Sequence, residues 1–173
     1  MTNLKDSEFG FKQVSPENWL KIDPVWGAFG AVAEQPDPFD PWIVEVLGFN
    51  LSLSVPVEVR KLFEVARGTI AYSLLYYPLI TIGTEQLFRV YEAAATHKCG
   101  QLNAPASQTA QFAHRIKWLV ERGAILPEDR IRWDAVRDLR NSTSHPKNQS
   151  IFDPNMALSM LEGTVALIGH LFS

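Results

Sequence analysis

The chain has 173 residues, of which 46% are hydrophobic and 20% are charged, and its formal net charge is -3 at pH 7. These proportions are typical of a soluble globular protein and exclude an intrinsically disordered one. The length is sufficient for one domain with a sizeable core and is short for two. The single cysteine, Cys99, excludes a disulfide framework or a cysteine-based metal site within one chain.

Charge is distributed unevenly along the sequence. Residues 1–66 carry five Lys or Arg against ten Asp or Glu, whereas residues 111–148 carry eight against five. A modest positive excess of this kind permits a local anion-binding site. It argues against broad, non-specific coating of the surface by nucleic acid.

Residues 1–55 are interpreted as an N-terminal extension, rich in proline and tryptophan, that packs on the main body. Ser15-Pro16 and Asp40-Pro41 each predict the start of a short helix, because a capping residue precedes proline at the first helical position. Gly48 can end the second of these helices. A lid or a partner surface is the alternative reading of this extension. The early acidic residues and the lack of a basic-then-apolar signal pattern favour a cytoplasmic protein.

From Pro56 onward the pattern becomes strongly helical, with Gly68 either a stop or a bend. The next run, from Thr69 to about His97, contains the most apolar stretch of the chain, residues 68–84. This stretch predicts a buried central helix, which Pro78 ends or kinks; a membrane span is the alternative.

Three further helices follow at helical spacing of apolar residues. The first is expected from Ser107 to about Arg122, the second from Pro127 to Arg140, and the third from Asp153-Pro154 to the end of the chain. No alternating pattern competes convincingly, although residues 43–55 leave one short strand open. The sequence therefore predicts an all-α, up-and-down helical bundle over residues 56–173.

The stretch from Arg140 to Pro146, Arg-Asn-Ser-Thr-Ser-His-Pro, is the clearest candidate for chemistry. On one continuous helix, Arg140 and His145 would point roughly 140° apart. Asn141 and the three hydroxyl residues after it favour caps and turns, and Pro146 disfavours the α conformation at His145. We therefore expect Arg140 to end one helix and His145 to fold back from the turn.

An arginine and a histidine brought together at a helix break suit reaction at a phosphodiester. Histidine can move a proton near neutral pH, and arginine offers a permanently charged, planar donor set to phosphate oxygens. In RNA the ribose 2'-hydroxyl is an internal nucleophile, so proton transfer and charge stabilisation cleave the backbone and leave a cyclic phosphate. This reaction requires no metal and no cofactor. Asn141 could orient either neighbour or contact the substrate.

Arg140, Asn141 and His145 also match the signature of the HEPN family of helical domains, an Arg followed by a polar residue and, four to six residues on, by a His. The context supports the likeness, because Trp133 to Leu139 precede the motif and a long amphipathic helix follows it. The chain resembles this family over about residues 56–172. Many HEPN domains are metal-independent ribonucleases of toxin or anti-phage defence systems and act as homodimers with two motifs in one cleft. Others are inactive binding or dimerisation modules.

The resemblance further implies an acidic or polar residue from the preceding long helix. Glu85 is the first candidate, because it interrupts an apolar stretch just after Pro78, and Glu92 on the same face is the second. An ordinary helical ion pair of Glu85 with Arg89 is the alternative. Pro146 and Lys147 follow the histidine, so the tyrosine of one toxin branch and its nucleotidyltransferase antitoxin are not implied. Another protein antitoxin or partner remains an expectation.

The remaining basic residues and histidines have other interpretations, and so does the motif. Arg137 and Lys147 are the basic residues expected to reach bound RNA. His97, His114 and His170 lack ligand spacing with one another or with Cys99, so no metal site is expected. For the motif itself, the alternative is that Arg140 pairs with helix-end carbonyls or an acid while His145 caps the next turn. A non-catalytic dimerisation or RNA-binding module is the alternative function.

Overall fold

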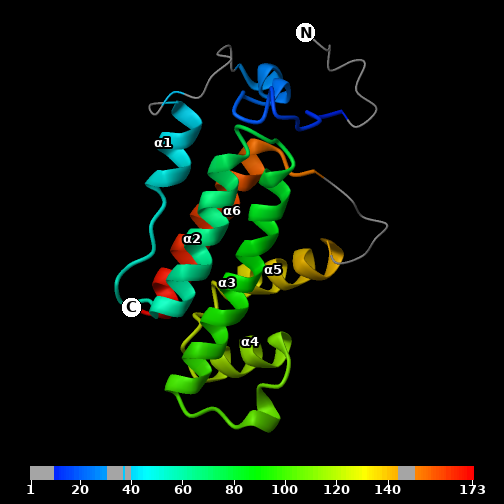
Figure 1. Cartoon of the computed structure of the whole chain (residues 1–173). Helices are drawn as coiled ribbons and strands as arrows, with labels where there is room; N and C mark the ends of the chain where they lie inside the picture. Colours follow the sequence, from blue (N-terminus) through cyan, green and yellow to red (C-terminus); the bar gives the residue numbers. More distant parts are fainter. Residues whose placement is uncertain (1–9, 31–36, 38–39, 144–150) are drawn as a thin grey trace.

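A computed structural model describes residues 10–30, 37, 40–143 and 151–173, and within these ranges every regular element is a helix (Figure 1). The prediction of an all-α helical bundle is confirmed for this part of the chain. The α-helices are α1 (Pro41–Gly48), α2 (Val57–Tyr72), α3 (Leu79–Gln101), α4 (Phe112–Glu121), α5 (Arg130–Thr143) and α6 (Pro154–Leu171), and the short 3-10 helices are η2 (Pro24–Phe29) and η3 (Ala106–Gln108).

Helices α2 and α3 form a closely packed antiparallel hairpin, and α6 packs on α3 (Figure 1). The sequence predicted a buried helix over residues 68–84 that Pro78 ends or kinks. A break at Pro78 is present, but it is longer than expected, because α2 continues through Gly68 only to Tyr72, the chain turns over residues 73–78, and α3 begins at Leu79. Gly83 lets the two helices approach. A Cβ atom at this position would lie 2.8 Å from the backbone nitrogen of Ile70 and 2.9 Å from the carbonyl oxygen of Ala66.

The turn between α2 and α3 is covered by the N-terminal segment. The Trp26 indole N–H donates to the carbonyl oxygen of Ser73 at 2.8 Å, and Trp42 donates to that of Ile70 at 3.3 Å. The fully buried Asp23 carboxylate accepts a hydrogen bond from the backbone N–H of Tyr77 at 2.9 Å. These contacts explain why the apolar run turns back: distant residues satisfy the backbone groups that the turn leaves open.

The proline-started helices follow local signals. Asp40 caps α1 through a 2.9 Å hydrogen bond from the N–H of Trp42, and Asp153 caps α6 through one of 2.9 Å from that of Met156. Both predictions are confirmed. Three other predicted starts are wrong. Ser107 lies in η3 and α4 begins only at Phe112, Ser15-Pro16 leads into turns, and the helix expected from Pro127 begins at Arg130 after a turn.

Helices α4 and α5 pack on the C-terminal half of α3, away from the α2–α3 turn (Figure 1). Trp133 of α5 is buried and meets Tyr91 of α3 edge to face, with ring centroids 5.3 Å apart. Burial raises the pKa of the Tyr91 phenol to about 12. The start of α5 is tied to the end of α6, because Asp129 Oδ2 lies 2.9 Å from His170 Nδ1. Of the helices that the structure describes, none has the length and apolar character needed to cross a membrane.

Candidate functional site

Arg140 lies in the last turn of α5, and the helix continues for three residues beyond it, to Thr143. The prediction that Arg140 ends the helix is therefore wrong. The helix penalties of asparagine, serine and threonine are below about 0.7 kcal/mol each, which tertiary packing can outweigh. The Thr143 hydroxyl donates to the carbonyl oxygen of Arg140 at 3.1 Å, and a basic residue in the last turn complements the helix dipole.

The carboxylate of Glu92 joins Arg140 to a second arginine. Its Oε2 atom lies 3.1 Å from Nη2 of Arg140, and its Oε1 atom lies 3.2 Å from Nη1 of Arg115. Glu92 comes from α3, Arg140 from α5 and Arg115 from α4. Along the sequence Glu92 is 48 residues from Arg140 and 23 residues from Arg115. We call Glu92, Arg115 and Arg140 the arginine–carboxylate cluster.

The cluster follows from how α5 and α4 bury their apolar faces. Trp133, Val136 and Arg140 stand at positions i, i+3 and i+7 of α5, so the burial of the first two turns Arg140 toward α3. On α4, Ile116 is buried and Arg115 next to it reaches Glu92. The side chains remain open to solvent to different extents: 40% for Arg140, 34% for Glu92 and 17% for Arg115.

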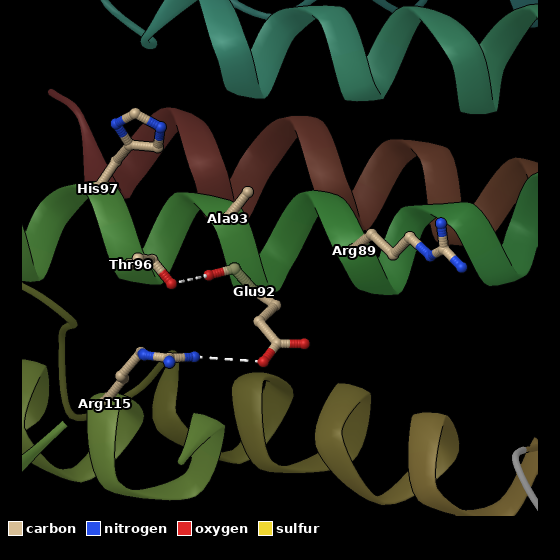
Figure 2. Close-up of a pocket in the computed structure, with 6 residues that line it drawn as sticks. All are labelled: Arg89, Glu92, Ala93, Thr96, His97 and Arg115. Atoms are coloured by element: carbon tan, nitrogen blue, oxygen red, sulfur yellow. Dashed lines mark hydrogen bonds and ion pairs between the residues drawn. The ribbon is translucent and has the colours of Figure 1, made fainter. Parts of the chain in front are cut away.

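A pocket of about 350 Å³ opens beside this cluster (Figure 2). It is lined by Arg89, Glu92, Ala93, Thr96 and His97 of α3 and by Arg115 of α4. In Figure 2 the Glu92 carboxylate points from α3 toward the Arg115 guanidinium, and Arg89 and His97 extend from α3 on either side of it along the helix. The pocket is therefore basic, because its two arginines outnumber its one carboxylate.

Several predicted site residues lie elsewhere or outside the described residues. His145 and Lys147 fall in residues 144–150, which the structure does not describe. Asn141 is exposed on α5. Arg137 bonds Asp134 at 2.8 Å and Asp138 at 2.8 Å, so two carboxylates already neutralise it.

Of the two candidate acids, Glu92 rather than Glu85 contacts Arg140 in the described chain. Glu85 is exposed seven residues before Glu92, roughly 10 Å along α3, and no ion pair with Arg89 is found for it among the described residues. Arg115 was missed as a site residue because its partner lies 23 residues away and no local pattern marks the pair. Its position beside the buried Ile116 was the only available signal.

The cluster has the composition of an anion site. Glu92 balances one of the two arginines that it contacts, and a carboxylate held between two guanidinium groups also fixes their orientation. Within the described ranges, no three His, Cys, Asp or Glu side chains are grouped as a metal site requires. Burial raises the pKa of the Cys99 thiol, and nearby Arg115 only partly opposes this effect, so the surroundings of Cys99 favour the neutral thiol.

Comparison with protein-family models, with curated proteins and with solved structures found no match for this chain. The residues of the cluster and the motif that contains Arg140 are therefore the features that bear on function.

Proposed function

We propose that the protein is a metal-independent endoribonuclease of the HEPN kind, with Arg140, His145 and Glu92 as its central residues. The observation that carries this proposal is the contact of 3.1 Å between Arg140 and Glu92, an acid of the long helix that precedes the motif. An acid in this place is what the resemblance to HEPN domains implies. His145 follows Thr143, the last residue of α5, by two positions in the sequence.

The proposed reaction needs only proton transfers and charge stabilisation. His145 takes the proton from the 2'-hydroxyl, and the 2'-oxygen bonds to the adjacent phosphorus. The bond from phosphorus to the 5'-oxygen then breaks, the departing oxygen takes a proton from water, and His145 returns its proton to the solvent, which leaves a 2',3'-cyclic phosphate and a 5'-hydroxyl. Arg140 stabilises the negative charge that builds on the phosphate oxygens, and Glu92 holds its guanidinium in place.

A second candidate function is a non-catalytic RNA-binding or dimerisation module. It is favoured by the same contacts, because Arg140 and Arg115 both already have a carboxylate partner in Glu92. Pairing of this kind can serve packing alone, and exposed ion pairs typically contribute about 0–1 kcal/mol to stability.

The proposal is tested with purified protein, varied RNAs and a chelator that removes divalent metal ions. We expect cleavage that leaves cyclic phosphate ends, and no cleavage of an RNA whose 2'-hydroxyls are all methylated. The His145→Ala protein should bind this methylated RNA as the wild type does and leave ordinary RNA intact. Intact RNA with wild-type protein, or unchanged cleavage by the variant, would contradict the proposal.

The resemblance also motivates proposals about assembly and role. We propose a cytoplasmic homodimer in which two motifs face one cleft, and a role as a toxin or defence component held in check by a protein partner. Expression of the wild-type chain should then slow cell growth more than that of the His145→Ala chain, and sedimentation should give twice the 19.5 kDa chain mass. A monomer in solution would argue against the two-motif cleft.

A further inference from the structure

We propose that the pocket beside the arginine–carboxylate cluster binds the RNA backbone one nucleotide away from the linkage at Arg140. Its function would be to hold the strand through Arg89 and Arg115 while Arg140 acts on the neighbouring phosphate. This inference rests on the proposed function for its ligand. It adds a binding subsite made of residues outside the Arg-Asn-His motif.

The pocket carries more positive than negative charge. Among the described residues no hydrogen bond or ion pair is found for the Arg89 side chain, which is exposed on α3. Within the described part of the chain, the Arg115 side chain makes one hydrogen bond, to Glu92, although a guanidinium has five N–H donors. The pocket therefore has donors and positive charge left over, which is what a phosphate group requires.

The pocket extends along α3. Arg89, Glu92 and Thr96 occupy one face of α3, and Arg89 and Thr96 are seven residues, or roughly 10 Å, apart along the helix axis. This length exceeds a single phosphate group and suits a nucleotide with a phosphate at each end. The volume of about 350 Å³ is at the small end of ligand pockets, which run from about 300 to 1,000 Å³. The ring of His97 offers a surface on which an unpaired base can stack.

The pocket adjoins the proposed reaction site at Arg140. Glu92 lines the pocket and also contacts Arg140, so a single side chain separates the two places (Figure 2 shows its contact with Arg115). A polymer with regularly spaced phosphates can occupy both, whereas a free phosphate ion occupies only one. The pocket therefore fits a single-stranded RNA that passes from Arg89 to Arg140.

The test measures binding of a fluorescent RNA with all 2'-hydroxyls methylated, which the proposed reaction cannot cleave. Arg89→Gln should weaken binding roughly tenfold, because it removes one charge-assisted contact. It should also lower the slope of log affinity against log salt by about 1. Lys117→Gln is the matched control, since Lys117 has the same charge, is two residues from Arg115 on α4, is 71% exposed and does not line the pocket.

The outcomes separate this inference from the proposed function. Wild-type protein that binds the methylated RNA but cleaves no RNA, with the expected loss in Arg89→Gln, would support the subsite and refute the ribonuclease. Arg89→Gln that matches Lys117→Gln in affinity and salt slope would overturn the subsite, whether or not the protein cleaves RNA. Absence of RNA binding by the wild type would also overturn the subsite. So would an Arg89→Gln protein that loses affinity for an acidic peptide but binds the methylated RNA as the wild type does. His97→Ala should weaken binding without a change in the salt slope.

Discussion

At the start of α3, the rings of Trp26, Trp42 and Tyr77 shield the α2–α3 turn from water, whereas charged side chains remain partly exposed around Glu92 on the same helix. The Trp26 centroid lies 4.7 Å from that of Trp42 and 5.6 Å from that of Tyr77. We call these three residues the aromatic clasp. Its polar groups bond backbone atoms, and the buried Asp23 carboxylate beside it accepts backbone N–H groups.

The aromatic clasp and the arginine–carboxylate cluster differ in what they contribute, the first to the stability of the fold and the second to ligand binding. The clasp buries large apolar surfaces, which contribute several kcal/mol, and its polar atoms are satisfied by fixed backbone partners. The arginine–carboxylate cluster buries little and holds charges that water and ligands can still reach. Substitutions in the clasp should therefore unfold the protein, and substitutions in the cluster should change what it binds.

The largest stability effect is expected from Trp26→Ala in the aromatic clasp. Trp26 is 4% exposed and donates to Ser73, so its removal should cost about 3–5 kcal/mol of unfolding free energy. Urea denaturation measures this change. Trp19→Ala is the control, because Trp19 is 57% exposed and should change stability by less than about 0.5 kcal/mol. Equal changes in unfolding free energy for the two tryptophans would show that the clasp does not stabilise the fold.

A smaller loss is expected from Gly83→Ala, which brings a methyl group against the backbone of α2. The Ile70 nitrogen and the Ala66 oxygen cannot move away as a flexible side chain could, so the cost should be about 1–3 kcal/mol. Gly100→Ala on the same helix meets no atom within 4 Å and should be neutral or stabilising by up to about 1 kcal/mol. Thermal denaturation of both variants tests this, and a destabilised Gly100→Ala with an unaffected Gly83→Ala would contradict it.

The smallest stability effect is expected from Glu92→Gln in the arginine–carboxylate cluster. The ion pairs are partly exposed, so the unfolding free energy should change by no more than about 1 kcal/mol. Loss of the negative charge should strengthen binding of methylated RNA severalfold, because the carboxylate that both arginines contact no longer repels phosphate. Cleavage of ordinary RNA should slow, since the Glu92 carboxylate no longer orients Arg140. Weaker binding together with a large loss of stability would show a structural role for Glu92.

The sequence predicted the parts of this comparison that depend on local signals. The caps at Asp40 and Asp153 follow from neighbouring residues. A break at Pro78 was predicted, but the extent of the turn over residues 73–78 could not be, because Trp26 and Asp23, about 50 residues earlier, hold it.

The candidate site was predictable to a similar extent. Arg140 was found from its motif, and Glu92 was only a second choice behind Glu85. The choice between the two acids depends on which turn of α3 faces α5, and this is set by the packing of Trp133 against Tyr91. Arg115 carries no such local signal, because its contact with Glu92 arises only when α4 packs on α3.

The proposed role of Arg140 in the reaction is tested by the single-turnover rate of RNA cleavage by Arg140→Ala at saturating protein. Arg130→Ala is the matched control, because Arg130 lies at the opposite end of α5 and is 55% exposed. We predict a rate lower by about 10²–10³ for Arg140→Ala, the loss typical of one stabilising group at a developing charge, and an unchanged rate for Arg130→Ala. Equal rates for both variants and the wild type would contradict the assignment of Arg140 to the reaction.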